Sequence, residues 1–213
     1  METADVKKDF STIVAEVLAF VFHPLLIPSY SLILLMLADP VLNNLISLKI
    51  KFILLAFVFS GTAIIPVFLI LLLKKKKVIS SVYLHDRVER ITPLAGTTIL
   101  FYLVYNMLSN SGLPAIISLM SLVSAFLTLA ILIITLFWKI SIHTTAMGGM
   151  LASFICISGE LSISPVIICA VLILLCGLVA FSRIKTNAHQ PAQVYAGFLM
   201  GILITGLFFY FMY

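Results

Sequence analysis

Charged residues are scarce in this chain. Only 10% of the residues are Asp, Glu, Lys or Arg, whereas 62% are hydrophobic, and the mean hydropathy is +1.24. A water-soluble domain carries roughly a quarter charged residues, so the composition excludes that class and indicates an integral membrane protein. No stretch is both polar enough and long enough to form a separate soluble domain. We therefore predict one membrane domain that comprises residues 1–213.

Residues that could bind a metal or a nucleic acid are also few. The three cysteines lie inside apolar runs and match no metal-binding spacing, and His, Asp and Glu do not recur at the spacing of a metal site. The run Lys74–Lys77 is short and follows an apolar run, which is typical of a membrane flank that contacts anionic lipid headgroups. The sequence predicts no metal, no other cofactor and no nucleic-acid partner.

The chain consists mainly of long apolar runs. They are continuous and do not alternate with polar residues, so they indicate transmembrane helices and not a β-barrel. A helix needs about 20 apolar residues to span a bilayer, and the fifth run is short. The first contains Pro24 and Pro28, which interrupt a helix, so it is either a bent span or a re-entrant segment. We predict an all-α, polytopic bundle of six to seven transmembrane helices, drawn from the runs Ile13–Leu37, Ile50–Leu73, Ile91–Leu108, Pro114–Phe137, Thr145–Ser158, Ser164–Phe181 and Ala192–Tyr213.

Three polar clusters interrupt these runs: His85–Pro93, Trp138–Thr145 and Ser182–Gln193. Two runs separate each cluster from the next, so all three should emerge on the same side of the membrane. Basic residues gather on that side, and the opposite side holds only Lys49 and Lys51. Because loops rich in Lys and Arg stay in the cytoplasm, we predict that the clusters face the cytoplasm, at the inner membrane of a bacterium.

Small residues recur in two of the runs. Gly197 and Gly201 form a Gly-x-x-x-Gly pattern in the last run, and glycines and alanines gather at the start of the fifth. Such residues let helices approach closely in lipid. We interpret them as packing residues that can also bring the fifth and last runs together.

A histidine precedes the start of a predicted helix in two of the clusters. Pro191 follows His189, and proline is favoured in the first turn of a helix; His143 precedes two threonines that could cap a helix. Helix starts attract anions, and Arg183 could bind phosphate oxygens in pairs. This combination is typical of phosphoryl transfer, which needs a nucleophile, a proton donor and fixed positive charge.

A further histidine lies inside the first apolar run. His23 stands beside Pro24, and an ionisable group within the membrane is a candidate for a functional role. The alternative is a structural histidine that hydrogen-bonds the backbone carbonyls left free at Pro24.

The last two polar clusters resemble the motifs of a known family. The segment Ser182–Gln193 is similar to the S-R-x5-H-x3-D signature of the type 2 phosphatidic acid phosphatase superfamily, and Ser141–His143 is similar to its P-S-G-H element. The resemblance covers roughly residues 85–213. It implies a helical membrane enzyme that removes phosphate from lipids through a phosphohistidine and without a metal.

The resemblance implies a role for each matching residue. His189 would be the nucleophile, and His143 would be the acid that protonates the leaving lipid oxygen. Arg183, Ser182 and Ser141 would bind the phosphate.

The chain departs from the family at the first motif, K-x6-R-P. The corresponding segment contains Arg87 and Arg90 but neither the lysine nor an adjacent Arg-Pro pair. Residues three apart share one face of a helix, so both arginines could bind the same phosphate. The alternative is an ion-pair network at the membrane surface, because Asp86 lies four residues before Arg90.

A second departure is Gln193, where the family has an aspartate. A glutamine oxygen can accept the imidazole proton and fix the tautomer of the catalytic histidine. It cannot offset the positive charge that grows as the histidine attacks. In the serine-protease triad, replacing the carboxylate by an amide costs about 10⁴ in turnover.

We therefore predict a membrane lipid phosphatase that hydrolyses a lipid phosphomonoester or an isoprenoid diphosphate, with a phospholipid or isoprenoid phosphate as substrate and membrane lipids as neighbours. Two alternatives keep the same site: a phosphotransferase that passes the phosphoryl group to another acceptor, and a phospholipid binder or translocator that Gln193 has made inactive. A purely structural membrane subunit is the fourth possibility, and it leaves the coincident polar clusters unexplained.

Overall fold

The computed structural model describes residues 9–82, 84, 86–161 and 164–213, and His85, Lys7 and Lys8 lie outside this part. The described part is helical and contains no strand, as predicted. Within these described ranges, six helical segments are long and apolar enough to cross a membrane, and a shorter apolar helix, Ile142–Cys156, accompanies them. The six segments are Phe10–Ala38, Leu48–Lys75, Val88–Ser109, Ala115–Thr135, Pro165–Lys185 and Pro191–Met212.

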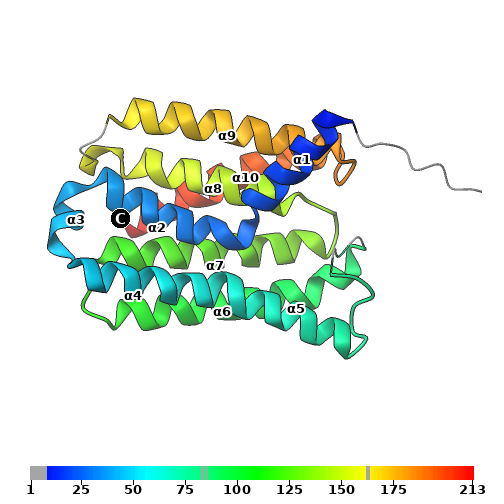
Figure 1. The fold of residues 1–213 in the computed structure, drawn as a ribbon, viewed down its shortest axis with the longest axis horizontal. Coiled ribbons are helices and arrows are strands. Elements are labelled where there is room, and N and C mark those ends of the chain that lie inside the picture. The colour runs from blue at the N-terminus through cyan, green and yellow to red at the C-terminus, as the bar shows by residue number, and fades with distance from the viewer. Residues whose placement is uncertain (1–8, 83, 85, 162–163) are drawn as a thin grey trace, which may run out of the picture.

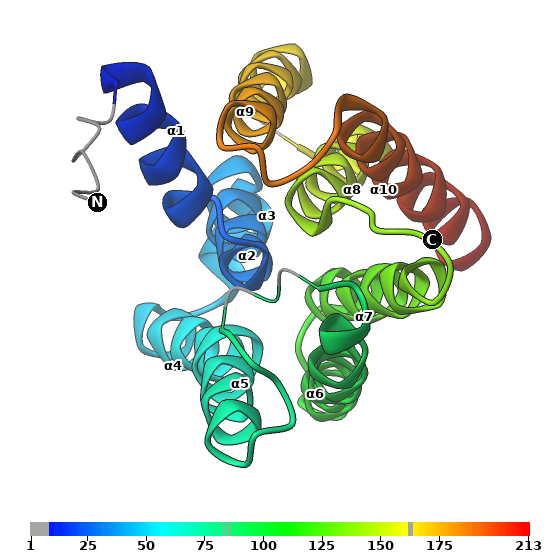
Figure 2. The same cartoon turned by 90° about the vertical axis from the view of Figure 1, so that its right-hand side faces the viewer.

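The elements form one bundle whose helices run along its long axis (Figure 1). In chain order they are α1 (Phe10–Val21), η1 (Pro24–Leu26), α2 (Ile27–Ala38), α3 (Pro40–Leu45), α4 (Leu48–Phe59), η2 (Ser60–Ile64), α5 (Ile65–Lys75), η3 (Val88–Arg90), α6 (Ile91–Ser109), α7 (Ala115–Thr135), α8 (Ile142–Cys156), η4 (Ser158–Glu160), α9 (Pro165–Lys185) and α10 (Pro191–Met212). Viewed along the axis, α8 lies beside both α9 and α10, and α6 lies beside α7 (Figure 2).

The connections that carry the polar clusters lie at one end of the bundle, which we call the polar end. The links from α5 to α6, from α7 to α8 and from α9 to α10 all meet there, at the right of Figure 1. Hydrogen bonds join the links to the ends of neighbouring helices: Arg87 donates to the Thr135 carbonyl of α7 (3.1 Å), and Ser141 N–H donates to the Gln193 carbonyl of α10 (3.3 Å). In the described residues the three clusters thus lie at one end of the bundle, in agreement with the predicted parity of the runs.

The first apolar run is a bent span. It starts with α1 at the polar end, breaks at His23 and Pro24, and continues as α2 to the opposite end (Figure 1). Pro24 has no N–H and ends the helix. His23 caps the short η1 turn that follows, because its Nδ1 accepts a hydrogen bond from Leu25 N–H (3.3 Å). The break therefore brings an imidazole into the interior of the bundle.

Helices α8 and α10 are in contact through their backbones. A Cβ added to Gly201 would lie 2.2 Å from the Thr145 carbonyl oxygen, and one added to Gly197 would lie 2.8 Å from the Ser141 carbonyl oxygen. Only glycine permits this approach. The packing role predicted for the Gly-x-x-x-Gly pattern is confirmed, and the contact brings together the two helix starts that carry His143 and His189.

Replacing Gly201 by alanine should destabilise the protein by about 1–3 kcal/mol, the usual cost of overpacking a rigid contact. The added methyl group would meet backbone atoms of α8 that cannot move aside. Gly206→Ala on the same helix is the matched control, because no atom lies within 4 Å of its added Cβ. Thermal unfolding in detergent measures both. Equal unfolding temperatures for the two variants would contradict this account of the contact.

Candidate active site

The corner between α9 and α10 explains why an arginine and a histidine six residues apart lie together. Asn187 adopts the left-handed conformation (φ 52°), which asparagine tolerates. Ala188 N–H then donates to the Arg183 carbonyl (3.2 Å) and Asn187 N–H to the Ile184 carbonyl (3.0 Å), the two bonds of a Schellman motif. His189 N–H also donates to the Arg183 carbonyl (3.3 Å). The chain thus folds back over the last turn of α9.

The His189 ring is held by Gln193. Its Nδ1 lies 3.0 Å from Gln193 Oε1, and the same oxygen accepts a hydrogen bond from Gln190 N–H (3.3 Å). Gln193 is the third residue of α10 and forms a capping box with Gln190. Because Oε1 is an acceptor, Nδ1 carries the proton, and the lone pair of the neutral ring lies on Nε2.

The start of α8 is tied to the start of α10. Ser141 is the N-cap residue of α8, and its Oγ accepts from Thr144 N–H (3.5 Å). Thr144 Oγ1 donates to the Val194 carbonyl of α10 (2.9 Å). These bonds are buried. They fix the position of His143, in the first turn of α8, relative to His189.

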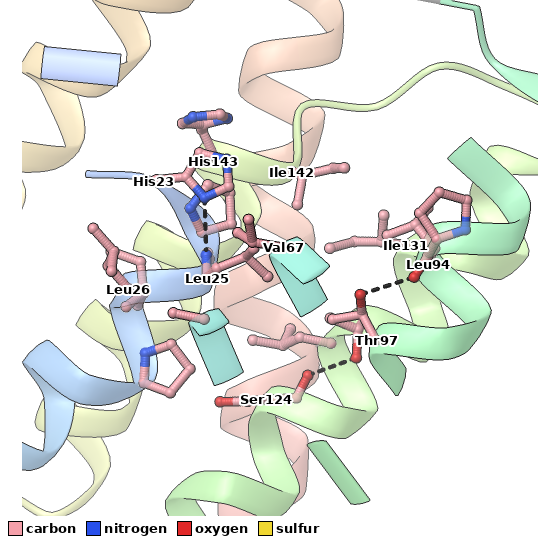
Figure 3. A pocket seen from close by; sticks show the side chains of 18 of the residues that line it. His23, Leu25, Leu26, Val67, Leu94, Thr97, Ser124, Ile131, Ile142 and His143 are labelled. Atoms are coloured by element: carbon pink, nitrogen blue, oxygen red, sulfur yellow. Dashed lines mark hydrogen bonds between the residues drawn. The ribbon is translucent and has the colours of Figure 1, made fainter. Parts of the chain in front are cut away.

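His143 meets the broken first span. Its Nε2 lies 3.1 Å from the Ala19 carbonyl oxygen, near the end of α1. Its ring also packs edge-on against the His23 ring, with ring centroids 5.4 Å apart and planes at 77°. Figure 3 shows the two imidazoles close together beside the apolar side chains Leu25 and Val67.

Three cationic side chains reach the same region: Arg90, Lys139 and Arg183. Arg90 is buried and donates through Nε to the Leu84 carbonyl (2.8 Å) and through a terminal nitrogen to the Ile140 carbonyl (3.4 Å). The Nε of Arg183 is buried and has no hydrogen-bond partner among the described residues. A buried donor without a partner is costly, so Arg183 is suited to an acceptor brought by a ligand.

These groups line one cavity of about 1340 Å³. His143, His189 and the three cations line the part of the cavity nearest the polar end of the bundle. Farther in, its wall is mostly apolar and comes from the first two spans and from α6, α7 and α8; Figure 3 shows part of it, including Leu94 and Ile131. Most small-molecule sites have volumes of about 300–1,000 Å³, so this cavity has room for a headgroup and a hydrocarbon chain.

Three of the predicted phosphate ligands do not line this cavity. Arg87 donates to the carbonyls of Thr135 and Leu136 and so caps the end of α7. Ser182 is buried, and its hydroxyl donates to the Ala15 carbonyl of α1 (2.6 Å). Ser141 is buried in the cap of α8. The structure therefore brings together His143, His189, Arg90 and Arg183, and it leaves both serines and Arg87 in structural contacts.

The cavity is also lined by two residues to which the sequence analysis gave little weight, Lys139 and His23. Lys139 was only one of the basic residues that gather on the side of the polar clusters, although it lies two residues before Ser141. His23 was a candidate in its own right. Its Nδ1 accepts a hydrogen bond from Leu25 N–H, so this ring nitrogen caps the turn that follows the break. Among the described residues, no group of three or more His, Cys, Asp or Glu is arranged to hold a metal ion.

Burial and positive neighbours set the ionisation of the site. The pKa of His189 is lowered to about 4, mainly because burial disfavours the imidazolium, and the charges of Arg90, Arg183 and Lys139 lower it further. The hydrogen bond with Gln193 opposes this shift. Burial also lowers the pKa of Lys139, with the same two arginines contributing. His189 is therefore neutral at physiological pH, as a nucleophile must be.

Comparison with family models identifies one match. The model described as "PAP2 superfamily" matches residues 56–213, which is well over half of the chain and contains every site element except the first span. Comparisons with curated proteins and with solved structures give no match.

Gln193→Glu should raise the pKa of His189, because a carboxylate at the position of Oε1 favours the imidazolium. Glutamate also preserves the capping box. Gln193→Ala should move the pKa in the opposite direction, because it removes the hydrogen bond that opposes the downward shift. NMR titration of ¹⁵N-labelled imidazoles, with His189→Ala for assignment, measures both changes. If the pKa of His189 in the glutamate variant were equal to or below the wild-type pKa, the hydrogen bond between His189 and residue 193 would be refuted.

Proposed function

Since this chain belongs to the PAP2 superfamily, we propose that it is a membrane phosphatase that removes phosphate from a lipid phosphomonoester or an isoprenoid diphosphate through a phosphohistidine. The observation that carries the proposal is the Arg183 guanidinium, whose buried Nε has no partner among the described residues, in a cavity that two histidines line. Phosphate oxygens supply such acceptors, and a planar guanidinium binds them in pairs.

The phosphate would lie among Arg90, Lys139 and Arg183. Arg90 is anchored by two backbone carbonyls, so it presents its remaining donors from a fixed position. Charge that is already in place when the reaction begins stabilises the transition state without reorganisation. In a buried site, where few solvent molecules screen it, this contribution is larger than in water.

His189 would be the nucleophile. Its Nδ1–H is directed to Gln193, so Nε2 carries the lone pair that attacks phosphorus. The bond from Nε2 to phosphorus forms as the bond to the leaving oxygen breaks, and the electron pair of the broken bond stays on that oxygen. Water then attacks the phosphohistidine, releases phosphate and restores the neutral ring.

His143 would protonate the leaving oxygen. Its Nε2 is engaged with the Ala19 carbonyl, so the proton would pass from Nδ1 of the imidazolium to the oxygen. In the second half of the reaction, the same Nδ1 would take a proton from the attacking water. Both histidines line the cavity, which supports a division of roles between them.

The apolar part of the cavity supports a lipid substrate. The polar end would hold the phosphate, while the hydrocarbon chain would extend between the helices toward the opposite end. The basic residues at the polar end favour a cytoplasmic site in an inner membrane. Phosphatidic acid and an isoprenoid diphosphate both fit this description, because the cations contact only phosphate.

His189→Ala should abolish phosphate release from both lipids, and His143→Ala should reduce it by about 10²–10⁴-fold, the usual contribution of a general acid. The assay is phosphate release by the purified protein in mixed micelles of detergent and lipid. Acid-labile ³²P on the wild-type protein, absent from His189→Ala, would report the intermediate. Cys156→Ser, in the last turn of α8, is a control expected to retain wild-type activity.

The outcomes separate the proposal from its rivals. Phosphate release that neither histidine variant changes would overturn it. Label transferred to an added alcohol in preference to water identifies a phosphotransferase. Lipid binding without turnover, converted to turnover by Gln193→Glu, identifies an inactive family member whose missing carboxylate explains the loss.

A further inference from the structure

The break in the first span leaves backbone carbonyls free, and each of them has acquired another donor. The last four carbonyls of a helix have no partner within it. Here the Leu18 carbonyl accepts from Phe22 N–H (3.0 Å) and the Phe20 carbonyl from His23 N–H (3.3 Å). The Val21 carbonyl accepts from the Tyr30 hydroxyl (3.0 Å). The Ala19 carbonyl remains, and its partner is His143 Nε2 at 3.1 Å.

His23 adds a second contact to the same imidazole. Because Nδ1 of His23 accepts from Leu25 N–H, the position of this ring is fixed by the η1 turn. It meets the His143 ring edge-on at 5.4 Å between centroids, an arrangement typical of attractive ring pairs. Figure 3 shows both rings at the same part of the cavity wall.

We propose that the bent first span completes the site, with the Ala19 carbonyl and His23 holding His143 in the orientation and tautomer that expose its Nδ1 to the leaving oxygen. His23 is then a positioning residue that acts through His143. This inference rests on the proposed lipid phosphatase function. The span lies outside the residues that the family model matches, so the family match by itself says nothing of this contact.

The physical reason is the need for a fixed tautomer. A neutral imidazole can carry its proton on either nitrogen, and the hydrogen bond of one nitrogen decides which. With Nε2–H bonded to a carbonyl, Nδ1 is the atom that accepts and delivers the second proton. Without the His23 ring against it, the imidazole could rotate and exchange the two nitrogens.

The test is His23→Asn. Asparagine can still accept the Leu25 N–H bond and cap η1, but it removes the ring that contacts His143. We expect kcat for phosphatidic acid to fall roughly tenfold, a fraction of what a general acid contributes. For p-nitrophenyl phosphate, whose leaving group departs without a proton, the single-turnover rate of nitrophenolate release, which reports phosphorylation of His189 and not its hydrolysis, should change less than about threefold. Tyr30→Phe is the matched control, because it loosens the same break through Val21 without touching the cavity.

A double-mutant cycle establishes whether His23 acts through His143. In the His143→Ala background, adding His23→Asn should change the rate by no more than about twofold, because the residue it positions is gone. Equal losses in kcat for phosphatidic acid and in the single-turnover rate of nitrophenolate release would indicate a merely structural role for His23, and multiplicative effects of the two substitutions would indicate independent roles. Either result overturns the inference.

A measurement that needs no turnover separates this inference from the proposed function. Long-range ¹⁵N NMR spectra of the imidazoles report the tautomer, and His143→Ala assigns the signals. The wild-type protein should show His143 protonated on Nε2, and His23→Asn should shift it toward a mixture. An unchanged tautomer overturns the positioning role even if the protein releases no phosphate, whereas a shifted tautomer in an inactive protein supports it and leaves only the phosphatase proposal refuted.

Discussion

The close contact between α8 and α10 is the interaction on which the site depends. Glycine at positions 197 and 201 lets the two backbones meet, with Thr145 and Ser141 of α8 directly against α10. The bond from Thr144 Oγ1 to the Val194 carbonyl then fixes the two helix starts in register. In lipid, helices gain little from hydrophobic burial against each other, so such packing and hydrogen bonds decide their arrangement. Two imidazoles from remote segments reach one cavity because these backbones touch.

Gln193 serves the fold and the candidate chemistry through the same atom. Its Oε1 accepts both the Gln190 N–H of the capping box and the His189 Nδ1–H. A neutral amide satisfies both donors without adding a buried charge, whereas a carboxylate would add one near three cations. The amide thus preserves the geometry of the corner and the tautomer of His189. What it does not supply is negative charge next to the ring, and burial and the cations consequently keep the pKa of His189 at about 4.

The sequence predicted the features that depend on spacing. Run lengths and parity gave the helical bundle and the shared end of the polar clusters, and the Ser-Arg-x5-His spacing corresponds to one Schellman corner that turns His189 over Arg183. The sequence did not predict which of the candidate phosphate ligands already donate their hydrogen bonds to the protein itself. Arg87 and Ser182 have the residue types of phosphate ligands, but carbonyls at the end of α7 and on α1 occupy them. Such partners come from other segments, so only the three-dimensional arrangement identifies them.

The same limit on prediction applies to the first span, whose break follows from the sequence but whose hydrogen-bond partners do not. Pro24 predicts that a helix is interrupted, and the cost of unpaired backbone groups in lipid predicts that every freed carbonyl will find a donor. Neither principle names the donors. Neutral imidazole is a suitable donor because it offers one N–H and keeps its other nitrogen available as an acceptor. His143 can therefore satisfy the Ala19 carbonyl and still line the cavity with Nδ1 left as an acceptor, so a break that would otherwise cost stability is stabilised by a group that the proposed mechanism also uses.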